Sequence, residues 1–111
     1  MEVSFDNQRL QRLCNKEAKL RGKYGPRMAA LVQQRLVELR DAENLDTLRP
    51  LPALRCHELT GNLAGLIAVR LVEPDRLVFR PDHDPLPMGE GGGLDGSRVT
   101  RIVVAGIGDY H

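Results

Sequence analysis

The spacing of the apolar side chains changes once along the chain, at the prolines Pro50 and Pro52. Before them, apolar residues recur every three or four positions, which predicts one helix from about residue 6 to 19–23 and a second over 26–42. After them, segments rich in Val, Leu and Ile predict four strands, over 54–60, 66–72, 76–80 and 98–107. A helical half followed by a strand half favours an α+β fold, in which helices cover one face of an antiparallel sheet.

Residues 1–111 are expected to form a single domain. A short strand is predicted before the helices, because Glu2-Val3-Ser4-Phe5 alternates in polarity. The hydrophobic fraction of 41% is sufficient for a core. The segment 81–98 is rich in Gly and Pro, so it is predicted to be a loop inserted between the last two strands.

Several classes of protein are disfavoured. No apolar run approaches the ~20 residues of a membrane span, so we expect no membrane contact. The first residues lack the pattern of an export signal, and Cys14 and Cys56 are too few for a disulfide framework. A cytoplasmic location is therefore expected.

The net charge of +1 conceals a separation of charge along the sequence. Residues 9–27 carry seven basic side chains and one acid, Glu17, whereas 81–98 is acidic. On the first predicted helix, which we expect Asp6 to cap, the basic residues form a stripe beside the apolar one: Arg9, Arg12, Lys16, Lys19 and Lys23. Two interpretations of this stripe stay open: a solvated helix face, or a surface that follows the backbone of ribosomal RNA.

Three further features carry chemistry. The chain closes with Asp109-Tyr110-His111 directly after an apolar strand. In Arg55-x-His57-x-Leu59-x-Gly61, alternate residues share one face of a predicted strand. The following strands add the guanidinium groups of Arg70, Arg76 and Arg80.

Together these motifs resemble the HigB branch of the RelE/ParE toxins. The resemblance rests on the Arg-x-His-x-Leu-x-Gly element, Gly65 four residues later, the strand Ala68-Val69-Arg70-Leu71 and the Asp-Tyr-His ending. The repeated Leu and Ala between Leu36 and Leu48 is similar to the segment that leads into the sheet of that family. The similarity covers most of the chain apart from 81–98.

The resemblance implies a RelE-like fold and the toxin of a type II toxin–antitoxin pair, an endoribonuclease that cuts mRNA on the ribosome. Its partners would be the ribosome, mRNA and a helix-turn-helix antitoxin similar to HigA. The resemblance assigns the catalytic role to His57, Asp109, Tyr110 and His111. Arg76, with Arg70 and Arg55, would bind the RNA phosphate.

The residues themselves are compatible with that chemistry. Metal-free RNA cleavage needs a base for the 2′-hydroxyl proton, an acid for the leaving oxygen and cations around the phosphorane. Histidine titrates nearest neutrality, and arginine binds phosphate with two donors. We expect no cofactor and no metal, because Cys14, Cys56, His57 and His111 lack zinc-like spacing.

Two positions depart from the pattern of the family. Thr60 stands where a lysine is common, and Asp75 stands where an aromatic residue commonly precedes the phosphate-binding arginine. Both changes weaken the expected phosphate binding. An alternative function is therefore an attenuated or ParE-like toxin, which binds DNA gyrase or only its antitoxin and does not cut RNA.

Overall fold

The computed structural model describes residues 1–110. The helices are α1 (Gln8–Asn15), α2 (Glu17–Tyr24) and α3 (Pro26–Asp41). The strands are β1 (Glu2–Phe5), β2 (His57–Glu58), β3 (Ile67–Arg70), β4 (Arg76–Pro81) and β5 (Arg101–Gly108). Short 3₁₀ turns lie at η1 (Leu45–Thr47), η2 (Gly61–Leu63) and η3 (Gly96–Arg98). The predicted α+β class is confirmed.

The strands form one five-stranded sheet in the order β1-β5-β4-β3-β2. β1 pairs with β5 in parallel, and the other neighbours are antiparallel. The expected sheet of four strands is therefore extended by the N-terminal strand. A parallel pair requires a long connection, and here nearly the whole chain supplies it.

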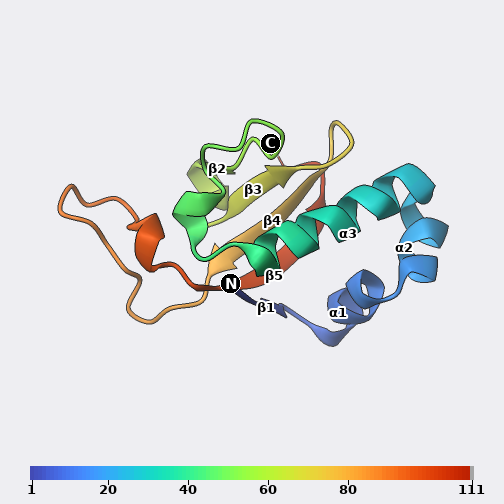
Figure 1. The fold of residues 1–111 in the computed structure, drawn as a ribbon, viewed down its shortest axis with the longest axis horizontal. Coiled ribbons are helices and arrows are strands. Elements are labelled where there is room, and N and C mark those ends of the chain that lie inside the picture. Colours follow the sequence, from blue (N-terminus) through green and yellow to red (C-terminus); the bar gives the residue numbers. More distant parts are fainter. Residues whose placement is uncertain (111) are drawn as a thin grey trace.

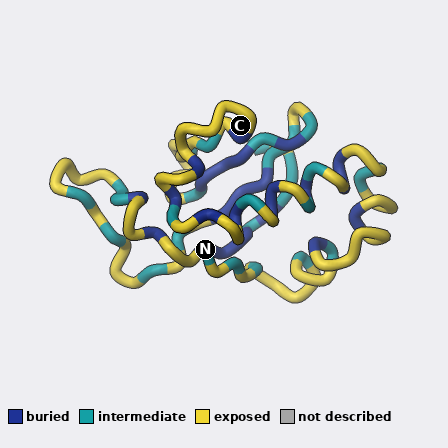
Figure 2. The backbone as a smooth tube through the Cα atoms, in the orientation of Figure 1, coloured by how far each residue is buried: buried dark blue, intermediate teal, exposed yellow. Residues whose placement is uncertain are grey.

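The core lies between α3 and one face of the sheet (Figure 1). Pro26 begins α3 at a position where its missing N–H has no cost. One side of α3 buries Met28, Val32, Leu36 and Leu39 against strand residues that include Leu77, Phe79, Ile102 and Val104. Buried stretches recur along α3 and run through the central strands (Figure 2).

The first predicted helix is two helices, because the chain breaks at Lys16, whose backbone is extended (φ −125°, ψ 109°). The cap of α1 is Asn7, whose side-chain oxygen accepts a hydrogen bond from the Leu10 amide at 2.8 Å. The predicted cap, Asp6, instead pairs with Arg80 on β4 at 2.8 Å. The break turns α2 back beside α1, so the basic stripe is not straight.

Arg35 lies near the middle of the apolar side of α3, where a charged side chain is expected to reach outward to the rim of the core. It is instead buried, with 4% of its surface exposed. Its Nε donates to the carbonyl of Arg70 at 2.7 Å, and its Nη2 donates to the carbonyl of Ala53 at 3.2 Å. Its Nη1 donates to Glu38 at 2.7 Å. Arg35 therefore ties α3 to the end of β3 and to the segment before β2.

The predicted strand over 54–60 is reduced to the two residues of β2. Arg55 has a φ of 45°, a conformation that interrupts extended pairing and is strained for a residue with a side chain. The Leu54 carbonyl still accepts from the Arg70 amide at 2.7 Å. This turn directs the chain into β2 and fixes the position of His57.

The 81–98 loop is more ordered than its composition predicts. It contains η3 and an isolated bridge between Met88 and Leu94. His83 Nε2 accepts from the amides of Thr100 and Arg101, at 3.1 and 3.3 Å. The loop lies at the opposite end of the molecule from α2, along its longest axis (Figure 1).

Candidate functional site

The face of the sheet opposite α3 carries residues from strands that are distant in the sequence. Leu77 and Phe79 point into the core, so Val78 between them points to the other face. The strand pairing places His57, Ala68, Val78 and Gly106 in one row across that face. A second row holds Arg70, Arg76 and Gly108. We call this surface the open face because α3 packs on the other one, although its central residues Ala68, Val78 and Gly106 are themselves buried.

Tyr110 lies on the open face as well. A side chain built at Gly106 would point to this face, where it would meet the Tyr110 hydroxyl. At Gly108 it would approach the edge of the same ring at 3.5 Å. The chain therefore turns back after β5, and the tyrosine ring covers both glycines.

His57 and Tyr110 thus share a face but are not in contact across the sheet. Three inter-strand gaps separate His57 from Gly106, which corresponds to about 14 Å between the two backbones. Between them on this face lie Ala68 of β3 and Val78 of β4, which are fully buried. Asp109 is exposed beside Tyr110, and the predicted role of His111 lies outside the described residues.

The imidazole of His57 is oriented by a hydrogen bond to the backbone. Its Nδ1 lies 2.7 Å from the carbonyl oxygen of Arg55. A carbonyl only accepts, so Nδ1 carries a proton, and in the neutral ring Nε2 is the atom that can take one. The side chain is exposed, which gives a substrate access to Nε2. This is the arrangement that a general base requires.

The predicted phosphate-binding arginines surround a carboxylate, Glu73, which the sequence analysis missed. Arg76 Nη1 donates to one oxygen of Glu73 at 3.1 Å, and Arg70 Nε lies 3.3 Å from the other. The hydrogen bond from Arg76, aided by the charges of Arg76, Arg70 and Arg55, lowers the pKa of Glu73. The arginines are thus gathered, but Glu73 already neutralises part of their charge.

One signal for this cluster exists in the sequence, because Glu73 lies three residues from both Arg70 and Arg76 in a tight hairpin connection. Arg80, on the same strand as Arg76, lies apart from it in the ion pair with Asp6.

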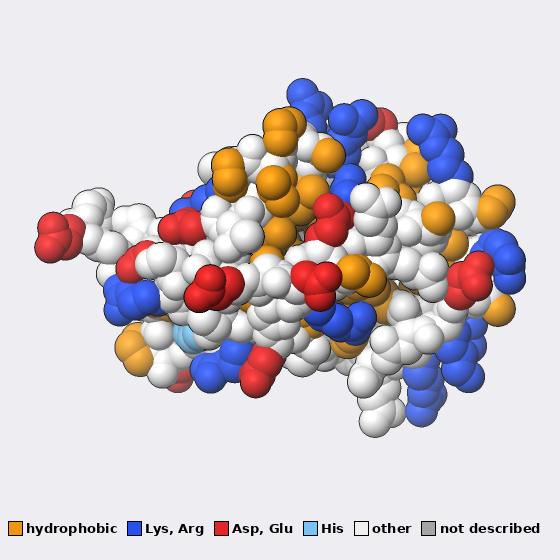
Figure 3. Space-filling view, in the orientation of Figure 1, with side chains coloured by type: hydrophobic (Ala, Val, Ile, Leu, Met, Phe, Trp, Pro, Cys, Tyr) orange, Lys and Arg blue, Asp and Glu red, His pale blue; other side chains and the backbone are white. Residues whose placement is uncertain are grey.

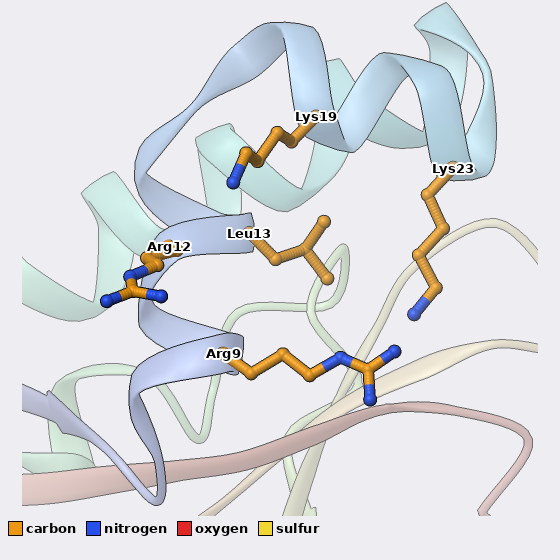
Figure 4. Close-up of a pocket in the computed structure, with 5 residues that line it drawn as sticks. All are labelled: Arg9, Arg12, Leu13, Lys19 and Lys23. Atoms are coloured by element: carbon orange, nitrogen blue, oxygen red, sulfur yellow. The ribbon is translucent and has the colours of Figure 1, made fainter.

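Most of the basic stripe gathers around a hollow between α1 and α2. Arg9, Arg12, Lys19 and Lys23 surround Leu13 in a hollow of about 270 Å³ (Figure 4). Lys16, at the helix break, instead lines a neighbouring hollow with Arg12. Lys and Arg side chains concentrate at this end of the molecule, whereas the tip of the 81–98 loop is acidic (Figure 3).

A second hollow continues from the first, because both are lined by Arg9, Leu13 and Lys23. It has a volume of about 220 Å³ and also reaches Tyr24, Tyr110 and β5 from Ala105 to Ile107. We call the two hollows together the basic groove. Tyr110 therefore borders both the basic groove and the open face.

Other chemistry is limited in the part of the chain that the structure describes. Within residues 1–110, no group of three or more His, Cys, Asp or Glu side chains is placed to hold a metal ion. Burial raises the pKa of Cys14 and of Cys56 to about 11, so neither thiol is a ready nucleophile at neutral pH. None of the helices in this range is long and apolar enough to cross a bilayer.

In comparisons with known proteins, the sequence matches no family model and no curated protein.

Proposed function

We propose that this protein is a ribosome-dependent mRNA endoribonuclease, the toxin of a toxin–antitoxin pair similar to HigB. The observation that carries the proposal is the placement of His57, Tyr110 and Arg76 on one face of the sheet, although 53 positions separate the histidine from the tyrosine. An imidazole, a phenol and a guanidinium are the kinds of group that metal-free RNA cleavage uses.

In this proposal, Nε2 of His57 takes the proton of a ribose 2′-hydroxyl. The 2′-oxygen attacks the adjacent phosphorus, and the bond from phosphorus to the 5′-oxygen breaks. Tyr110, Asp109 or His111 supplies the proton to that leaving oxygen, and the products are a 2′,3′-cyclic phosphate and a 5′-hydroxyl. Arg76 and Arg70 stabilise the charge of the phosphorane. The His57 and Gly106 backbones are about 14 Å apart, so the proposal requires the two side chains to reach one ribose phosphate from opposite sides.

The biological setting follows from the same proposal. The protein acts in the cytoplasm on mRNA that is bound to the ribosome, and a helix-turn-helix antitoxin neutralises it. No cofactor takes part in the reaction.

The test is cell-free translation of a defined mRNA, read by primer extension. The parent protein is expected to produce position-specific cuts that depend on translation. His57→Ala and a chain that lacks His111 are expected to produce none. His83→Gln is the matched control, since it changes a histidine outside the open face and keeps a hydrogen-bond acceptor. Cuts of equal strength by the parent and both altered proteins would refute the proposed site.

A binding-only toxin is the second candidate, and the Glu73 contacts favour it. A carboxylate already occupies the space between Arg70 and Arg76, which a phosphate would need. This candidate predicts folded protein that leaves mRNA intact on translating ribosomes. A DNA damage response after expression in cells would then indicate gyrase inhibition, as in ParE toxins.

A further inference from the structure

Apart from Tyr110, the residues of the basic groove take no part in the cleavage chemistry proposed above. We propose that the groove is a binding site for single-stranded RNA, with phosphates on Arg9, Arg12, Lys19 and Lys23 and a base against Tyr24 and Tyr110. This inference rests on the proposed function only in the choice of RNA over DNA. The site itself is argued from its charge, its shape and its aromatic lining.

The carboxylates that the structure describes do not compensate the cations of the groove. Within residues 1–110, no carboxylate lies within ion-pair distance of Arg9, Arg12, Lys19 or Lys23, whereas nearby Arg21 pairs with Glu17 at 3.4 Å. The side chains of Arg9 and Lys23 extend toward one another beside Leu13 (Figure 4). Like charges held together repel each other, and a bound polyanion relieves that repulsion.

The break at Lys16 creates this concentration of charge. In one straight helix, residues 9 and 23 would lie about 21 Å apart along the axis. The break turns α2 so that Lys19 and Lys23 face Arg9 and Arg12 across one hollow. Four cations that a helix would spread along a line thus surround a space of about 270 Å³.

The inner part of the groove places two aromatic rings, Tyr24 and Tyr110, among polar and apolar side chains. Tyr24 is partly buried there, and Lys23 Nζ lies 5.5 Å from the centre of its ring. β1 leaves β5 after the pair Phe5–Val104, so the hollow opens beside the next residues of β5. The joined hollows fall within the range of roughly 300–1,000 Å³ that is typical of small-ligand sites.

This combination favours nucleic acid over an acidic protein segment. Single strands bind where cations follow the backbone and aromatic rings stack on bases. An acidic peptide would form ion pairs with the cations, but its carboxylates would offer no ring to stack on the two tyrosines. Since Tyr110 borders both surfaces, an RNA strand in the groove would continue onto the open face, where His57 lies.

Binding is tested by fluorescence anisotropy with a labelled 12-nucleotide RNA that carries 2′-O-methyl groups, so that it cannot be cut. The double variant Arg9→Gln, Lys23→Gln is expected to bind at least tenfold more weakly. The slope of log affinity against log salt should fall by about 1.4, because two phosphate contacts are lost. The control Arg40→Gln, Arg101→Gln removes the same charge outside the groove and is expected to stay within about twofold of the parent.

The aromatic part has its own pair of variants. Tyr24→Leu is expected to weaken binding about tenfold, and Tyr24→Phe, which keeps the ring, is expected to bind as the parent does.

Equal binding by the two double variants would overturn the proposal, and so would competition by poly-glutamate as strong as that by unlabelled RNA. DNA of the same sequence that binds more tightly than RNA would refute the choice of RNA.

The outcome is separable from that of the proposed function. His57→Ala is expected to bind the uncleavable RNA as the parent does while it cuts no mRNA. If the parent protein binds RNA normally but never cuts mRNA, the RNA-binding role of the groove is supported and the nuclease proposal is rejected. If the double variant Arg9→Gln, Lys23→Gln neither lowers RNA binding nor stops cutting, the groove proposal is rejected and the nuclease proposal is supported.

Discussion

The hydroxyl of Tyr110 lies so close above the backbone of Gly106 that a side chain at Gly106 would collide with it. The glycine therefore makes room for the ring that follows it on the same face. Gly108 lies under the edge of the same ring but leaves a distance of 3.5 Å to a built Cβ, which is an ordinary contact.

Gly106→Ala is expected to displace Tyr110 and to reduce mRNA cleavage at least tenfold, while the free energy of unfolding changes by less than ~1 kcal/mol because the clash falls on the end of a movable side chain. Gly108→Ala is the matched control and should cut as the parent does. Cleavage assays measure the loss of activity, and the NMR signals of the tyrosine ring report the displacement of Tyr110. Equal activity of both variants would show that the position of Tyr110 is unimportant.

Replacement of Glu73 by glutamine should release the charge of Arg70 and Arg76 for a phosphate. We expect a several-fold rise in the rate of mRNA cleavage, measured by primer extension under single-turnover conditions. Glu43→Gln removes an exposed carboxylate from the segment after α3 and should leave the rate unchanged. A lower rate in Glu73→Gln would instead indicate that Glu73 positions the arginines.

The pH dependence of Glu73 has a defined sign. Its folded pKa lies below the ordinary 4.5, so its ion pairs stabilise the fold fully above that value. This contribution disappears as the pH falls through the lowered pKa. Urea unfolding at pH 3 to 7 is expected to show a smaller loss of stability on acidification in Glu73→Gln than in the parent. Identical pH profiles would contradict the ion pairs.

Arg35→Met is expected to reduce the free energy of unfolding by about 3 kcal/mol, since the carbonyls of Arg70 and Ala53 lose their donor inside the protein. Arg40→Met, an exposed position on the same helix, should change it by less than ~0.5 kcal/mol. Urea denaturation measures both. A loss below 1 kcal/mol in Arg35→Met would mean that water replaces the missing donor.

The thiols of Cys14 and Cys56 should react slowly in the folded protein. With a pKa of about 11, roughly one thiol in ten thousand is ionised at pH 7. Labelling by a disulfide reagent is expected to be at least ~100-fold slower than in urea. Rapid labelling of one cysteine in the native state would locate an opening of the structure near that residue.

The sequence was sufficient for the fold class and for most elements, because periodicity and prolines report local structure. The break at Lys16 could not be predicted, since Lys19 and Lys23 keep the helical phase of Arg9 and Arg12 across it. The burial of Arg35 also depends on tertiary structure. Its acceptors are the carbonyls of Ala53 and Arg70, which are 18 and 35 positions away in the sequence. No local sequence pattern predicts these contacts.

The candidate site was predictable in its residue types and not in its geometry. Alternation predicted that Arg55 and His57 share one face of a strand, but Arg55 has a φ of 45° and β2 begins only at His57. The distance from His57 to the C-terminal tyrosine depends on the order of strands between them. Glu73 was overlooked because its effect arises only when the hairpin brings Arg70 opposite Arg76. The groove depends on two helices and an edge of β5 that meet only in three dimensions.

The position of β5 has a consequence for how the protein is made. β5 is the last of the five strands to leave the ribosome, yet it lies between β1, the first, and β4. Until it emerges, β1 has no neighbour to join, and Gly106 and Tyr110 are still inside the exit tunnel or unmade. The pairing of β1 with β5, and the contact between Tyr110 and Gly106, can therefore form only after β5 has emerged.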